Sequence, residues 1–135
     1  MRVTIEQVSV HRDGRGVVFE PLDPARIAVQ RNVHVVLTQP GCVRGNHYHR
    51  RGAETLTVFG PALVRIRDRQ TIKDTVVPEQ QAVRFTIPPG VSHAILNTGS
   101  QPNLLIAFNT FDHDPADPDV VRDVLIDPSP SHALA

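Results

Sequence analysis

The stretch that decides the fold covers residues 41–54 and reads Gly-Cys-Val-Arg-Gly-Asn-His-Tyr-His-Arg-Arg-Gly-Ala-Glu. It places His47 and His49 two residues apart and Glu54 five residues later. Residues two apart in a β-strand point to the same face, so the two imidazoles are expected to lie side by side. On a helix the same spacing would splay them apart. The valine-rich segment that precedes the stretch favours a strand.

A second stretch, about forty residues later, supplies a third imidazole. It reads Pro-Pro-Gly-Val-Ser-His-Ala-Ile-Leu-Asn over residues 88–97 and carries His93. The Arg-Arg-Gly segment before Glu54 is typical of a turn, so Glu54 begins the next strand and points back to the same interior. Three neutral nitrogens and one carboxylate suit a divalent metal such as zinc, nickel, manganese or iron. We therefore expect a metal site with four ligands: His47, His49, Glu54 and His93.

The composition limits the classes of function. The chain has 135 residues, which suits one domain over residues 1–135, and its 14 basic residues balance 14 acidic ones. This balance argues against a nucleic-acid or membrane partner that is bound by bulk charge. The single cysteine, Cys42, fits a reducing compartment, and the N-terminus lacks a long apolar run, so we expect a cytoplasmic protein.

Twelve prolines and eight glycines interrupt the chain at short intervals, a rhythm typical of an all-β sandwich or barrel. The apolar pattern predicts strands over residues 3–10, 17–22, 27–38, 54–59, 62–67, 71–77, 83–87, 92–96 and 104–110. Residues 120–126 are expected to form a short helix or an arm. The tail from about residue 127 is expected to be flexible.

The two stretches resemble the two motifs of the cupin superfamily, G-x5-H-x-H-x3/4-E-x6-G and G-x5-P-x-G-x2-H-x3-N. The chain departs from them at two glycines, where it has Pro61 and Ala82. The matching positions are Gly41, His47, His49, Glu54, Pro88, Gly90, His93 and Asn97. The resemblance implies an all-β fold, a single cupin-type double-stranded β-helix, or jelly-roll, barrel.

A narrower resemblance concerns residues 44–49, Arg-Gly-Asn-His-Tyr-His. They look like the R-G-N-H-x-H segment of the cupin domain in capsular-polysaccharide sugar-nucleotide enzymes. They are also similar to the R-G-x-H-x-H of the dTDP-4-keto-6-deoxyhexose ketoisomerases. The resemblance implies an epimerase or isomerase of polysaccharide biosynthesis that acts on a keto sugar nucleotide, in a homodimer. Because the ketoisomerases are expected to lack both the metal and this glutamate, Glu54 favours the metal-holding group.

Such a reaction removes a proton beside a carbonyl and returns it elsewhere, so it needs a base that is free of the metal. His34 and Tyr48 are the candidates for this catalytic role. A rim histidine and a packing tyrosine are the alternatives, because Tyr48 alternates with the two histidines. Arg44 and Arg65 are candidates for substrate binding, since a guanidinium grips phosphate oxygens. The alternatives are a loop-bracing Arg44 and an Arg65 on an exposed strand face.

Two other functions remain open from the sequence. Three histidines and a glutamate around iron would suit a metal-dependent cupin oxygenase. A non-catalytic cupin that binds a sugar or another small ligand would need the same pocket without turnover. The cupin fold hosts many reactions, so the fold by itself does not choose between these functions.

Overall fold

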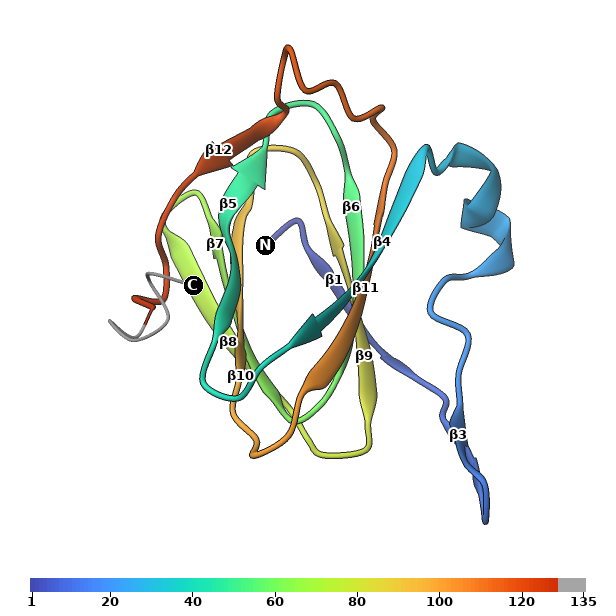
Figure 1. Ribbon diagram of the computed structural model, residues 1–135. Coiled ribbons are helices and arrows are strands. Elements are labelled where there is room, and N and C mark those ends of the chain that lie inside the picture. Colours follow the sequence, from blue (N-terminus) through green and yellow to red (C-terminus); the bar gives the residue numbers. More distant parts are fainter. Residues whose placement is uncertain (129–135) are drawn as a thin grey trace.

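The computed structural model describes residues 1–128 of the chain, and almost all of its regular structure is β-strand (Figure 1). Ten strands form two antiparallel sheets. The first sheet has the order β1 (Thr4–Val8), β9 (Ala82–Ile87), β6 (Glu54–Phe59), β11 (Asn103–Asn109) and β4 (Asn32–Thr38). The second has the order β12 (Val120–Arg122), β5 (Val43–His49), β10 (Ser92–Asn97), β7 (Ala62–Asp68) and β8 (Thr71–Val77).

The chain passes back and forth between the two sheets. From β4 to β12, consecutive strands lie in opposite sheets at every step except the hairpin of β7 and β8. This path closes the two sheets into a barrel, with β5 and β10 facing β6 and β11 (Figure 1). The prediction of an all-β jelly-roll barrel is therefore confirmed.

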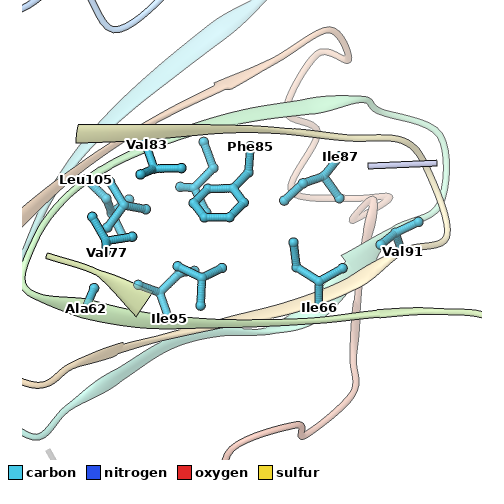
Figure 2. Close-up of a cluster of buried hydrophobic side chains, with 12 residues drawn as sticks. Ala62, Ile66, Val77, Val83, Phe85, Ile87, Val91, Ile95 and Leu105 are labelled. Atoms are coloured by element: carbon cyan, nitrogen blue, oxygen red, sulfur yellow. The ribbon is translucent and has the colours of Figure 1, made fainter. Parts of the chain in front are cut away.

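The core lies between the two sheets and follows the period of two of the strands. On β7, the side chains of Ala62, Val64 and Ile66 are buried, whereas the alternating residues are only partly covered. Figure 2 shows Val83, Phe85 and Ile87 of one sheet facing Ile66 and Ile95 of the other. The buried residues outside this apolar cluster include Glu54 and His93, which belong to the site described below.

A β-bulge interrupts β5 directly before the paired histidines. In the pairing with β10, His47 lies opposite His93 but Gly45 lies opposite Ala94, so Asn46 is the extra residue. Gly45 and Asn46 have φ values of 81° and 57°, in the left-handed region. A Cβ at Gly45 would lie 2.7 Å from the carbonyl oxygen of His93, so the close approach of the two strands requires glycine.

The structure corrects two of the predicted elements. The strand predicted over residues 27–38 begins only at Asn32, because Pro24–Val29 form the 3-10 helix η1. Local capping outweighs the β-propensity of this segment: the Asp23 side chain accepts a hydrogen bond from the Ala25 N–H, and proline occupies the first turn. The strand predicted over residues 17–22 is replaced by a hairpin of β2 (His11–Asp13) and β3 (Gly16–Val18) that extends away from the barrel (Figure 1).

Residues 120–126, expected as a short helix or an arm, form no helix. Val120–Arg122 are instead the strand β12, which pairs with β5. The Asn46 side chain at the bulge holds the residues that follow, because its Oδ1 accepts hydrogen bonds from the Leu125 and Ile126 N–H groups at 2.9 and 3.1 Å. The expected flexible tail falls largely on residues 129–135, outside the described residues. Within residues 1–128, no helix is long and apolar enough to cross a membrane.

Candidate metal centre

The four predicted ligand residues meet inside the barrel. His47 and His49 come from β5, Glu54 is the first residue of β6, and His93 lies on β10. Each offers one ligand atom, and the four atoms lie within 4.8 Å of one another. Strand alternation points both β5 histidines inward, as the sequence predicts, and the pairing of His47 with His93 brings in the third ring.

Glu54 is the common partner of two of the rings. Its Oε2 lies 2.6 Å from His49 Nε2, and its Oε1 lies 3.2 Å from His93 Nε2. The His47 ring meets the His93 ring edge to face, with 4.8 Å between their centroids. Glu54 and His93 are both buried. A buried carboxylate surrounded by imidazoles needs a positive charge beside it, which a proton or a metal ion supplies.

His93 shows how the site is prepared for a cation. Its Nδ1 lies 3.2 Å from the Val91 carbonyl oxygen, which can only accept, so Nδ1 carries a proton, and in the neutral ring Nε2 keeps a lone pair. This Nε2 is buried and has no hydrogen-bond partner within residues 1–128, although Glu54 Oε1 lies nearby without hydrogen-bond geometry. A bare nitrogen that faces a carboxylate oxygen is unfavourable unless a cation lies between them. The four side chains therefore fit a divalent metal.

The charge states of His47 and Glu54 agree with this fit, whereas His49 releases a proton when it binds a metal. Burial, and then the neighbouring His93, lowers the pKa of His47 to about 4, so that ring is neutral near pH 7. Burial also lowers the pKa of His49, but the hydrogen bond and charge of Glu54 and the nearby Asp119 outweigh it, and the net pKa is raised. Burial raises the pKa of Glu54, but the imidazoles outweigh it and hold the net pKa well below its usual range. Glu54 is thus ionised and His47 is ready to act as a ligand.

The four residues lie in the wall of a cavity of about 520 Å³, a size typical of small-molecule sites. His34 of β4 lines the same cavity, and so does Arg44 of β5. Strict alternation would turn Arg44 away from His47, which follows it by three residues. The bulge restores the common face, because Arg44 lies opposite Ile95 as His47 lies opposite His93.

The two other candidates lie elsewhere. Tyr48 is not among the residues that line the cavity; it pairs with Val121 of β12, between the two inward histidines. Arg65 is also absent from the lining, and its guanidinium pairs with Asp74 of β8 at 2.8 Å. The structure therefore brings His34 and Arg44 to the four-residue cluster, but neither Tyr48 nor Arg65.

Two residues that lie beside His49 were not predicted from the sequence. Asp119 Oδ2 lies 3.5 Å from His49 Nδ1, and Asn109 Nδ2 lies 3.4 Å from the same nitrogen. Asn109 ends the last core strand, a position that places a polar side chain at the rim of the barrel. Asp119 belongs to an Asp- and Pro-rich segment that resembles a solvated turn. Only the short Val120-Val121 pair that follows it hinted at a strand beside β5.

Comparison with solved structures gives the same fold. QdtA, a sugar 3,4-ketoisomerase from Thermoanaerobacterium thermosaccharolyticum in complex with TDP, is 17% identical, with a TM-score of 0.67 over 90% of this chain and 88% of that one. A 3,4-ketoisomerase from Helicobacter canadensis is 17% identical, with a TM-score of 0.70 over 91% and 92% of the two chains. At this level of identity, the likeness concerns the fold.

A third structure is closer in sequence. The capsular polysaccharide assembling protein CapF from Staphylococcus aureus is 26% identical, with a TM-score of 0.65 over 87% of this chain. The match covers 33% of CapF, so the present chain corresponds to about a third of that protein. No curated protein sequence matches the chain.

The sequence pattern of one family spans most of the chain. It matches residues 11–121, which include both histidine stretches, the cavity-lining strands and the beginning of β12. The predicted cupin barrel agrees with this family match and with the fold of the solved structures. The chain belongs to the polysaccharide biosynthesis C-terminal domain family.

Proposed function

We propose that the chain is a metal-dependent epimerase or isomerase that acts on a keto sugar nucleotide in polysaccharide biosynthesis. The observation that carries this proposal is the cluster of three imidazoles and one carboxylate in the wall of a cavity that a separate histidine and an arginine also line. The family match and the likeness to sugar-nucleotide ketoisomerases support the choice of substrate class.

His47, His49, Glu54 and His93 would hold the metal. A divalent ion bound there would act as a Lewis acid towards the carbonyl oxygen of the sugar. Glu54 and His93 are buried, and the partly exposed His47 and His49 lie in the cavity wall, where a substrate can approach the ion.

His34 is the proposed proton carrier. It projects into the cavity from β4, opposite Ala107 of β11, and it belongs to neither the four-residue cluster nor its hydrogen-bond partners. A neutral imidazole can take a proton from the carbon beside a carbonyl and return it from the same ring. Tyr48, the other candidate, lies outside the cavity lining and is not part of the proposal.

Arg44 is the proposed contact for the diphosphate of a nucleotide. Its side chain is exposed and lines the cavity on the same face as His47. A guanidinium presents paired donors that match phosphate oxygens, and the position beside the histidines suits a substrate whose sugar lies deeper than its diphosphate. Arg65 has no part in this proposal, because Asp74 already pairs with it.

Solvent exchange tests the proposal. The zinc-loaded chain is incubated with dTDP- and UDP-linked 4-keto sugars in D₂O, and NMR follows deuterium at the carbon beside the carbonyl. We expect incorporation in at least one sugar, lowered by roughly 10²- to 10⁴-fold in His34→Gln, as is usual for loss of a general base. Tyr48→Phe, the matched control, keeps the wild-type rate. Binding without exchange in every sugar would contradict the isomerase and support a non-catalytic binding protein.

Metal content separates the remaining alternative. Elemental analysis of the purified chain is expected to find about one divalent ion per chain, lost in His47→Ala. Zinc or nickel in the purified chain would agree with Lewis-acid chemistry. Iron with consumption of dioxygen would favour the oxygenase, because the same ligand set suits a redox metal.

The proposal includes a homodimer, formed through β4. This strand is at the edge of its sheet, and its outward side chains Val33, Val35 and Leu37 are 56%, 68% and 64% exposed. An apolar edge strand is normally covered, and a second copy fits because β4 can pair antiparallel with itself about a twofold axis. Light scattering is expected to give a dimer that Val35→Lys dissociates, while Val76→Lys on β8, equally exposed, does not. A monomeric wild-type chain would overturn this part.

A further inference from the structure

The segment between β11 and β12 crosses from one sheet to the other beside the cavity. Phe111, Pro118 and Asp119 of this segment line the cavity, so we call residues 111–119 the strap. The strap is fastened to the turn between β5 and β6: Arg50 and Arg51 both pair with Asp117 at 2.9 Å, and the Arg50 N–H donates to the Asp119 carbonyl oxygen. The metal ligands His49 and Glu54 flank this turn.

Asp119 is the member of the strap that reaches a predicted ligand. Its Oδ1 accepts hydrogen bonds from the backbone N–H and Nε of Arg51, at 2.8 and 3.1 Å. Its Oδ2 accepts one from the Gly52 N–H at 3.0 Å. The side chain is only 12% exposed. Three donors thus fix a buried carboxylate in one orientation, with Oδ2 directed to His49 Nδ1 at 3.5 Å.

The His49 ring therefore has a different partner at each nitrogen. Nε2 faces Glu54 within the four-residue cluster, and Nδ1 faces Asp119 on the strap. If Nε2 binds a metal, Nδ1 must carry the ring proton and needs an acceptor. Outer carboxylates or carbonyls of this kind orient metal-binding histidines and raise their basicity.

One other group competes for the same nitrogen. Asn109 Oδ1 accepts the Phe111 N–H at 2.8 Å, so the amide turns its Nδ2 to His49 Nδ1. An amide donor would favour a bare Nδ1, the opposite of what a metal at Nε2 requires. The two groups lie at nearly the same distance from His49 Nδ1, 3.4 Å for the amide nitrogen and 3.5 Å for Asp119 Oδ2, so distance does not choose between them. The amide is neutral, whereas Asp119 carries a full negative charge. The charge of Asp119 therefore favours a proton on His49 Nδ1.

We propose that Asp119 is a positioning residue for the metal site: its Oδ2 accepts the Nδ1 proton of His49 and so directs the Nε2 lone pair to the ion. The proposal rests on the metal-binding part of the proposed function. The strap would then have two roles, lining the cavity and orienting a ligand. The Asp119 carboxylate both holds the strap in place and contacts His49. The His93 ring has a neutral carbonyl in the corresponding place.

The test measures zinc affinity rather than activity. The full chain is stripped with a chelator and titrated with zinc in competition with a chromophoric chelator. Asp119→Asn keeps the size of the side chain but removes its charge, and we expect the affinity to fall roughly 10- to 100-fold, as is typical when an outer partner is lost. Asp117→Asn is the matched control, because Asp117 also pairs with Arg51, whereas only Asp119 faces His49. We expect it to bind zinc as the wild type does.

A second readout follows the proton itself. Nitrogen-15 NMR of the zinc-loaded wild type is expected to show His49 protonated at Nδ1, and circular dichroism checks that both variants are folded. Wild-type affinity in Asp119→Asn, or an equal loss in Asp117→Asn, overturns the inference and leaves the metal site in place. A folded wild-type chain that binds no zinc overturns both the metal site and this inference.

Discussion

Two buried carboxylates, Glu54 at the start of β6 and Asp68 at the end of β7, have different counter-charges. Asp68 accepts hydrogen bonds from the backbone N–H and the Nη2 of Arg2, both at 2.7 Å. Glu54 contacts the imidazoles of His49 and His93 at 2.6 and 3.2 Å. A guanidinium is always charged, but an imidazole is charged only when it binds a proton. The counter-charge of Asp68 is therefore permanent, and that of Glu54 can be exchanged for a metal.

If the proposed metal site is correct, this difference separates a structural carboxylate, Asp68, from a functional one, Glu54. Burial alone does not distinguish the two, since both side chains are nearly inaccessible. The partner distinguishes them, because a carboxylate that binds a metal must be surrounded by groups that can release a proton when the metal binds. The three predictions below test the distinction.

The largest effect is expected from Glu54→Gln. Loss of the ligand charge should lower zinc affinity by more than the roughly 10- to 100-fold that loss of an outer partner costs. The matched change, Asp68→Asn, should leave zinc affinity unaltered and lower the melting temperature instead, because Arg2 loses its partner. Competition titration and thermal melting of both variants measure this. Equal losses of affinity would show that the two carboxylates do not differ in the way described.

A smaller effect is expected from pH. The pKa of His49 is raised above 6.5 and that of His47 is lowered to about 4, so at pH 6 His49 holds a proton and His47 does not. Zinc binding at pH 6 should release about one proton, and the affinity should fall about tenfold per pH unit below the pKa of His49. Calorimetry in buffers of different ionisation enthalpy measures the release. Binding without proton release at pH 6 would contradict an exchangeable counter-charge.

The meeting of the four candidate ligands was predictable from sequence because they lie in two short stretches, and strand alternation fixes their direction. Arg2 and Asp68 were not, because their contact spans 66 residues and no local pattern marks it. The same holds for Asp119, which reaches His49 only because β12 pairs with β5. Residues 27–29 show a different limit: their side chains favour a strand, but the proline and the Asp23 cap of η1 decide the backbone.

The smallest effect concerns stability in acid. Hydrogen bonds from the Arg2 side chain and backbone lower the pKa of Asp68 from 3.8 to about 2. The stability that this pair contributes is present above pH 4 and is lost as the pH falls towards 2, because the unfolded chain takes up the proton first. Urea unfolding between pH 5 and pH 2 should therefore show a steeper loss in the wild type than in Arg2→Gln. Parallel curves of unfolding free energy against pH would mean that Arg2 does not lower the pKa of Asp68.

The bulge at Gly45 and Asn46 has a consequence for comparing this chain with its relatives. Because of it, the cavity-facing residues of β5 are 44, 47 and 49, spaced by three and then by two. A spacing of three keeps both groups on one face only while the bulge is present. A relative of the same length that lacks the bulge would lose either the arginine or the imidazole pair from its cavity, even with all of these residues in place. A relative that lacks the extra residue would have a spacing of two and would keep both groups on one face of a regular strand.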